Sequence, residues 1–149
     1  MKIADLLDEL ELFRDFSFQE LEIIAPYLRL EAVPEGTVIF NEGDPGTYML
    51  ILVNGSISIY KGGEHGRQLL SLETRGRIVG EMAMLDQERR SATCIAATAC
   101  ELLTLSGDNL TLLAAERPVI AYRFMFCLAR LLSRRLRRTS GMMADFLGG

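Results

Sequence analysis

Residues 76–93 read GRIVGEMAMLDQERRSAT and carry the clearest structural signal in the chain. The pattern predicts a glycine turn at Gly80, a short helix that begins at Glu81, and a polar loop that reaches Arg90. Gly80 lets a ligand approach the backbone closely, and the first N–H groups of the helix have no partner within it, so they can bind an anion. Arg90 adds a planar fork for two phosphate oxygens, and Ser91 adds a hydroxyl.

Each of these features also has an ordinary interpretation. Surface arginines are usually solvated, and a Gly-Glu pair at a helix start is usually a cap whose carboxylate favours the helix dipole. The alternative to a phosphate-binding segment is therefore a domain of the same fold that binds no ligand.

Short β-type runs lie on both sides of this segment. They predict six strands, at residues 37–40, 48–53, 56–60, 68–72, 92–97 and 101–105. Asn54-Gly55, between the second and third runs, predicts a hairpin with a type I′ turn, because both positions of that turn need positive φ. Six or more short strands at this spacing indicate a jelly roll or a barrel.

Helical patterns occupy the two ends of the chain. Apolar side chains recur at helical spacing in residues 3–10, and Ser17-Phe18-Gln19-Glu20 has the form of a capping box, so two short amino-terminal helices are expected. A helical period returns at residues 109–115. Pro118 then suits the first position of a long helix, since no Gly or Pro follows it up to Ser140.

The long helix carries two apolar lines. The first consists of Ile120, Phe124, Cys127 and Leu131. The second consists of Met125, Leu128, Leu132, Thr139, Met142 and Phe146. Arg135 occupies the fourth position of this line, between Leu132 and Thr139. We expect one line to face the barrel and the other, through the seam of Met125, Leu128, Leu132, Thr139 and Met142, to face a second long helix, as in a short coiled-coil dimer. The alternative is that both lines pack within the core of a single chain.

Length and composition indicate one soluble domain, since the chain has 149 residues, of which 49% are hydrophobic and 24% charged. Arg123 and Arg130 interrupt the most apolar stretch, so no membrane helix is expected, and the acidic amino end lacks the pattern of a secretion signal. A cytoplasmic protein is expected. Residues 1–116 contain 9 basic and 19 acidic side chains, whereas residues 117–149 contain 7 basic and 1 acidic. Any contact with nucleic acid or anionic lipid is therefore expected from the basic end.

The histidine and cysteine content argues against a metal enzyme or a nucleophilic enzyme. The single histidine, His65, lies in the glycine-rich stretch 61–66, which indicates an exposed turn. Cys94, Cys100 and Cys127 lack the spacing of metal ligands, and we expect them to be reduced thiols of the core. Neither a catalytic site nor a metal site is expected.

The segment 80–93 resembles the phosphate-binding cassette of cyclic nucleotide-binding domains. That family's motif is Gly-Glu-x-Ala-Leu, a short loop, and then Arg-x-Ala-Thr or Arg-x-Ala-Ser; here Met84 replaces the leucine. Residues 41–44, 48–53 and 56–60 also match the family's strand and glycine pattern in order.

The resemblance implies a mainly β fold with flanking helices, in which a β jelly-roll barrel has short amino-terminal helices and a long carboxy-terminal helix. One domain would span residues 1–149. It would comprise amino-terminal helices at 1–30, a jelly roll at 31–106 that includes the cassette 80–93, and carboxy-terminal helices at 107–147.

The resemblance also implies a role for each cassette residue. Glu81 would bind the ribose 2′-hydroxyl and Arg90 the cyclic phosphate. Backbone N–H groups near Met82, Ala83 and Ser91 would complete the site, with Gly80 and Ala92 as the remaining motif positions. Arg89 lacks the Arg-x-Ala spacing, and we expect it to face solvent.

The nucleotide base is predicted from two further positions. A Thr directly after the arginine is associated with guanine in this family, whereas this chain has Ser91, which favours cyclic AMP over cyclic GMP. Residues 134–140 resemble the Arg-Arg-Leu-x-x-Thr-Ser of bacterial cyclic AMP receptor proteins. Thr139 and Ser140 would therefore contact adenine across a dimer, although they arrive about one helical turn later than in those proteins.

These observations predict a stand-alone cyclic nucleotide sensor, not an enzyme, that needs no cofactor, binds cyclic AMP or cyclic GMP, forms a homodimer through its last helix and signals to a separate effector protein. Nine residues follow Ser140, so no DNA-binding domain is expected in this chain. The alternatives are the sensor part of a transcriptional regulator or other effector, and a ligand-free dimerisation module.

Overall fold

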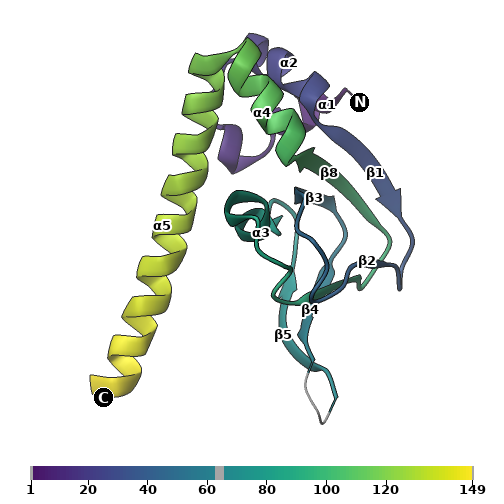
Figure 1. Cartoon of the computed structure of the whole chain (residues 1–149), viewed down its shortest axis with the longest axis vertical. Helices are drawn as coiled ribbons and strands as arrows, with labels where there is room; N and C mark the ends of the chain where they lie inside the picture. The colour runs from purple at the N-terminus through teal and green to yellow at the C-terminus, as the bar shows by residue number, and fades with distance from the viewer. Residues whose placement is uncertain (1, 63–65, 149) are drawn as a thin grey trace.

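Eight strands form two antiparallel sheets of four (Figure 1). The structure, a computed structural model, describes residues 2–62 and 66–148, with the backbone alone for 142–148. The first sheet has the order β1-β8-β3-β6, and the second has the order β2-β7-β4-β5. The strands are β1 (Arg29–Val33), β2 (Val38–Phe40), β3 (Tyr48–Asn54), β4 (Ile57–Lys61), β5 (Gln68–Glu73), β6 (Ile78–Val79), β7 (Thr93–Ala96) and β8 (Cys100–Ser106).

The predicted jelly roll is confirmed, but the two described sheets are not joined into a closed barrel. All six predicted strands are present, within two residues at each end. The sequence pattern did not indicate β1 and β6. Leu30 in β1 is 39% exposed, so this edge strand lacks a buried apolar period, and β6 has only two residues. The amino-terminal helices were expected to reach residue 30, whereas β1 begins at Arg29.

The predicted hairpin at Asn54-Gly55 is wrong. β3 and β4 lie in different sheets, and among the described residues Gln87 is the one non-glycine with positive φ, so Asn54 does not adopt a type I′ turn. Gly55 has φ of 94°, and a Cβ on it would lie 2.4 Å from the Ala99 carbonyl oxygen. This turn therefore carries the chain from one sheet to the other. The hairpin of this region joins β4 to β5, and His65, which was expected in an exposed turn, lies outside the described residues.

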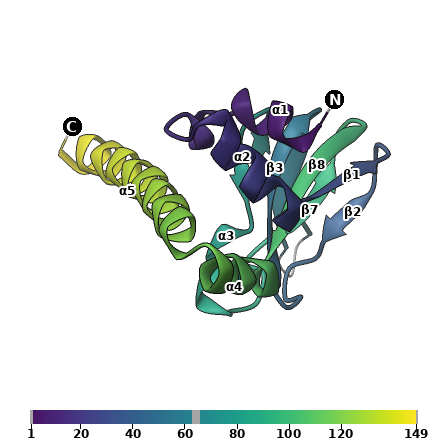
Figure 2. The ribbon, with the colours of Figure 1, turned by 90° about the horizontal axis from the view of Figure 1, so that it is seen from above.

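Helices cover one face of the first sheet (Figure 2). The helices of the described residues are α1 (Ile3–Asp8), η1 (Glu11–Phe13), α2 (Phe18–Ile24), η2 (Ala25–Tyr27), α3 (Glu81–Asp86), α4 (Gly107–Glu116) and α5 (Pro118–Gly148). The far part of α5 extends away from the sheets (Figure 2). The predicted capping box is confirmed, because the Glu20 N–H donates to Ser17 Oγ at 3.2 Å and the Ser17 N–H donates to Glu20 Oε1 at 2.9 Å. Pro118 begins α5 as predicted.

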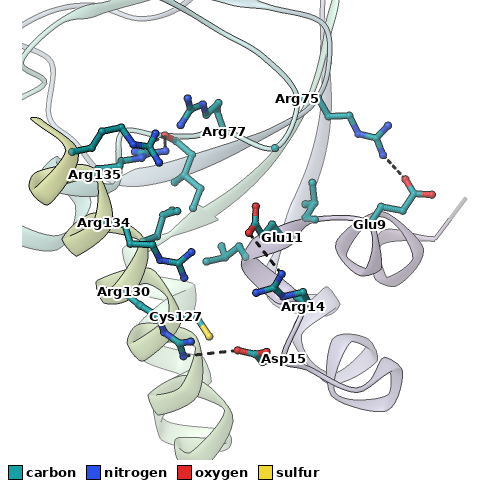
Figure 3. A pocket seen from close by; sticks show the side chains of 16 residues that line it. Glu9, Glu11, Arg14, Asp15, Arg75, Arg77, Cys127, Arg130, Arg134 and Arg135 are labelled. Atoms are coloured by element: carbon teal, nitrogen blue, oxygen red, sulfur yellow. Dashed lines mark hydrogen bonds and ion pairs between the residues drawn. The ribbon is translucent and has the colours of Figure 1, made fainter. Parts of the chain in front are cut away.

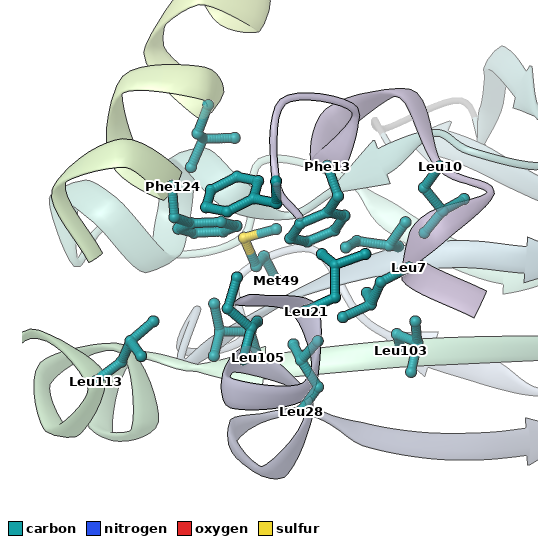
Figure 4. Packing of buried hydrophobic residues seen from close by; sticks show 14 of the residues in the cluster. Leu7, Leu10, Phe13, Leu21, Leu28, Met49, Leu103, Leu105, Leu113 and Phe124 are labelled. Carbon is teal, nitrogen blue, oxygen red and sulfur yellow. The ribbon is translucent and has the colours of Figure 1, made fainter. Parts of the chain in front are cut away.

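Both faces of β3 are buried, which explains its uninterrupted apolar run. Met49, Ile51 and Val53 pack with the helices, as Figure 4 shows around Met49. Leu50 and Leu52 pack in a second cluster between the sheets, together with Cys94 and Cys100. Cys94 and Cys100 are free, buried thiols as predicted, and burial raises the pKa of Cys94 to about 12. Cys127 is also free but only partly buried against the helical core.

The first half of α5 is anchored in the helical core. Phe124 is 2% exposed and its ring stacks on Phe13 with centroids 5.9 Å apart, while Leu128 is 0% exposed. Leu128 belongs to the apolar line that we expected to face a second helix. That expectation is wrong for this part of α5, because Leu128 and the partly buried Met125 and Leu132 pack into the core of their own chain. Farther along, α5 leaves the core, and Leu136 is 68% exposed. No helix in the described ranges is long and apolar enough to cross a membrane.

Candidate functional site

The predicted turn, helix and loop are present at the cassette. β6 ends at Val79, Gly80 adopts φ of 81°, and α3 runs from Glu81 to Asp86. A Cβ on Gly80 would lie 2.3 Å from Arg90 Nη1, so this glycine is needed both for its left-handed backbone and for the approach of the arginine. A Cβ on Gly46 would lie 2.2 Å from the Ala83 Cβ, which shows that the loop before β3 packs directly on α3.

Arg90 is buried at 3% exposure and is held by backbone and aromatic groups. Its Nη1 donates to the Gly80 carbonyl at 2.8 Å and its Nη2 to the Tyr48 carbonyl at 2.6 Å. The guanidinium carbon lies 4.1 Å from the centre of the Phe40 ring and 4.8 Å from that of Tyr48. These contacts fix the plane of the guanidinium against the short strand and the turn.

The charge of Arg90 is not balanced by a carboxylate in the part of the chain that the structure describes. Among the described residues, none lies within 4.0 Å of its guanidinium, and its buried Nε has no hydrogen-bond partner. Burial accordingly lowers the pKa of Arg90 from its usual value. A buried cation is costly unless it is paired, so this side chain is suited to receive an anion.

Glu81 is also buried, at 6% exposure, and its partner comes from the far end of the chain. Arg135 on α5 donates from Nη1 to Glu81 Oε1 at 3.1 Å and also reaches the Ile78 carbonyl at 3.4 Å. Burial is the main influence on this carboxyl and raises its pKa, and the opposing effect of Arg135 is smaller. The ion pair therefore connects the first residue of α3 to α5.

The structure also places the other predicted cassette residues. Ala83 is buried, whereas the side chain of Met82 is 65% exposed, so only the backbone of Met82 can take part in a site behind α3. Ser91 is exposed, and its carbonyl accepts from Lys61 Nζ at 3.0 Å. Ala92 is half-buried at the entry to β7. Arg89 is exposed as predicted and donates to the Gly43 carbonyl.

Thr139 and Ser140 are not brought to the cassette by any described contact. Both are exposed, and the Thr139 hydroxyl donates to the Arg135 carbonyl of its own helix at 3.0 Å. A base contact by these residues was predicted across a dimer, and it stays a prediction. Met142 and Phe146 of the same line have side chains outside the described part of the chain.

Residues 30–117 match the sequence profile of the cyclic nucleotide-binding domain. The chain belongs to the cyclic nucleotide-binding domain family. The domain is 32% identical over 127 residues to a cyclic AMP receptor protein of Thermus thermophilus, which covers 85% of this chain and 57% of that protein. It is 36% identical over 121 residues to a cyclic nucleotide-gated potassium channel of Mesorhizobium japonicum, covering 80% of this chain and 32% of the channel.

Solved structures show the same architecture. A cyclic nucleotide-binding domain from Methylobacillus flagellatus superimposes with a TM-score of 0.83 at 31% identity and covers 96% of this chain and 81% of that one. The chain spans about half, or less, of the length of the curated relatives named above.

Phe40 and Tyr48, which contact Arg90, were not assigned to the site from the sequence. The same is true of Arg135. The sequence did contain an indication of its role, because Arg135 is the charged residue in an otherwise mostly apolar line of α5. A charge in such a line indicates a specific partner, but the sequence does not say that the partner is Glu81. Among the described residues, no cluster of three or more His, Cys, Asp or Glu side chains is positioned to hold a metal ion.

Proposed function

We propose that this chain is a cyclic nucleotide sensor in which Arg90 holds the cyclic phosphate and Glu81 accepts from the ribose 2′-hydroxyl. The observation that carries the proposal is the buried guanidinium of Arg90, which has an unpartnered Nε and no carboxylate within 4.0 Å among the described residues. A phosphate would supply the missing anion, since an arginine fork matches two phosphate oxygens. Ser91, directly after the arginine, favours cyclic AMP over cyclic GMP as the ligand.

The proposed role is regulatory, not catalytic, and cytoplasmic, and α5 is its output element. A ribose hydroxyl that donates to Glu81 would compete with Arg135 for the same carboxylate. Nucleotide binding would then alter the contact that ties α5 to the cassette and so shift the position of the helix. A separate effector protein, or the remainder of a longer regulator as the relatives suggest, would respond to that shift.

A homodimer through α5 is part of the same proposal. Tyr122, Phe126 and Leu136 are 68%, 54% and 68% exposed, and with Ala129 and Ser133 they continue in alternating steps of four and three residues. This is the spacing of a coiled-coil seam. It replaces the seam through Leu128 as the face on which a second copy would pack.

Calorimetry with cyclic AMP and cyclic GMP tests the ligand assignment. We expect wild-type protein to bind cyclic AMP more tightly, and Arg90→Ala to weaken that binding by roughly 2 to 5 kcal/mol, because a charged partner of the phosphate is removed. Arg89→Ala is the matched control, since the neighbouring arginine is exposed and should change the affinity by less than about 0.5 kcal/mol.

Arg90 also supports the fold, so a loss of binding needs a second variant. Arg90→Lys keeps the charge but not the bidentate fork, and it should fold while binding more weakly than wild type. Equal effects of Arg89→Ala and Arg90→Lys, or no nucleotide binding by the wild type, would contradict the proposed function.

A further inference from the structure

A cavity lies between α5 and the amino-terminal segment 9–15 (Figure 3). Its volume is about 530 Å³, and its walls are the segment 9–15, the loop 75–78 before and within β6, and the face of α5 from Cys127 to Arg138. This volume is within the range of pockets that hold small molecules, roughly 300 to 1,000 Å³. Glu81 and Arg90 do not line it.

Among the residues whose side chains the structure describes, seven arginines and three carboxylates line the cavity, although the chain as a whole has a net charge of −4. Four of these arginines, Arg130, Arg134, Arg135 and Arg138, are on α5. The spacing of four residues between Arg130, Arg134 and Arg138 places all three on one side of the helix. The cavity is therefore a concentrated positive site on an acidic protein.

The other three arginines of the cavity come from the walls opposite α5. Arg75 and Arg77 come from the loop before β6, and Arg14 comes from the segment after η1. In Figure 3 the side chain of Arg134 extends from α5 toward this amino-terminal segment. An anion in the cavity would thus meet guanidinium groups from three separate parts of the chain.

The carboxylates of the cavity are already engaged with other arginines. Glu9 pairs with Arg75 at 2.5 Å, Asp15 with Arg130 at 3.8 Å, and Glu11 with Arg14 at 3.9 Å.

Among the described residues, Arg134 and Arg138 have no carboxylate within 4.0 Å, whereas the neighbouring Arg135 pairs with Glu81. The pairs that Arg14, Arg75 and Arg130 make are exposed and contribute little stability, so these three arginines can also turn toward a stronger anion.

We propose that this cavity is a second ligand site, for a small anion with at least two adjacent phosphate charges, and that Arg134 and Arg138 are its principal ligands. Two guanidinium forks one helical turn apart match two neighbouring phosphate groups better than a single charge. The cavity receives arginines from three directions, which favours a compact anion over an extended acidic segment of a protein. Neither Glu81 nor Arg90 lines the cavity, so its ligand would not share the proposed nucleotide contacts.

Inorganic pyrophosphate is the probe for this site, titrated into the full chain by calorimetry at low salt. Arg134→Gln combined with Arg138→Gln should weaken pyrophosphate binding at least about tenfold, because two charge-assisted contacts are lost. Arg137→Gln is the matched control, since Arg137 is on the same helix but does not line the cavity, and its effect should stay within about twofold. Pyrophosphate should raise the Tm of wild type and of Arg137→Gln, but not that of the double variant.

Four results would overturn the proposal. Wild-type protein that fails to bind pyrophosphate has no such site, and an equal loss in Arg137→Gln would show general attraction to a basic helix. Loss of pyrophosphate binding in Arg90→Lys would place the anion at the cassette. Tighter binding of a hexaglutamate peptide than of pyrophosphate would identify an acidic protein segment as the occupant. Failure of cyclic AMP to bind, by contrast, would leave the pyrophosphate result unchanged.

Discussion

Gly76 and Gly80 have similar backbones, with φ of 88° and 81°, but different surroundings. A Cβ on Gly76 would meet no atom within 4 Å, whereas a Cβ on Gly80 would lie 2.3 Å from Arg90 Nη1. Each change to alanine should lower the free energy of unfolding by roughly 1 to 2 kcal/mol through the left-handed backbone. Gly80→Ala should lower it further, because Arg90 would have to leave its two carbonyl partners. Urea denaturation measures both, and equal losses would show that Arg90 moves freely.

Glu81 makes stability depend on pH. Burial raises its pKa above the usual 4.5, so the folded protein binds this proton more tightly than the unfolded chain. As pH rises above 4.5 and through the raised pKa, wild type should therefore lose stability relative to Glu81→Gln, which does not titrate. Urea denaturation of both proteins from pH 4 to pH 7 measures the difference. Parallel curves would mean that the Glu81 pKa is not raised.

At the residue scale, the sequence predicted the cassette well. The distinction between Arg89 and Arg90 rested on the Arg-x-Ala spacing, and the structure agrees, because Arg90 is buried and Arg89 is exposed. The orientation of Arg90 was beyond sequence reasoning, since it depends on the carbonyl of Tyr48, which is 42 residues away.

At the scale of elements, α5 has an anchored half and a tethered half. Phe124 and Leu128 hold the first half in the core, while the second is attached through the pair of Arg135 and Glu81. Arg135→Gln should increase hydrogen exchange of α5 amides after Leu132 by roughly tenfold, because a charge-assisted contact no longer opposes local opening. Amides near Phe124 should be unaffected. Arg137→Gln, at an exposed position, is the control, and equal changes in both variants would contradict a tethering role for Arg135.

The strands show which elements a sequence predicts and which it does not. β3 and β8 have long apolar runs and were found, whereas β1 is a partly exposed edge strand and was not. The Asn54-Gly55 turn has the chemistry of a hairpin, but β4 pairs with β5 and β7 and not with β3. Turn residues indicate that the chain reverses, and long-range pairing decides which sheet it then joins.

At the scale of the whole molecule, the proposed dimer depends on the exposed face of α5. Phe126→Glu should convert the dimer to a monomer in light scattering without unfolding it, because this side chain is already 54% exposed in one chain. Leu112→Glu is the matched control, since Leu112 on α4 is 48% exposed and lies outside the proposed interface. A wild-type monomer, or a dimer that survives Phe126→Glu, would contradict this interface.

The turn and helix of the cassette, most strands and the start of α5 follow from the sequence alone. They depend on capping, glycine conformation and apolar period, which act between residues a few positions apart. The partition of strands between two sheets, the inward direction of Leu128 and the pairing of Glu81 with Arg135 were decided by the tertiary structure. Glu81 and Arg135 are 54 residues apart, and Arg123, which donates to the Glu20 carboxylate, is 103 residues from it. Contacts over such separations form only when the packed core brings the elements together, so no local pattern in the chain specifies them.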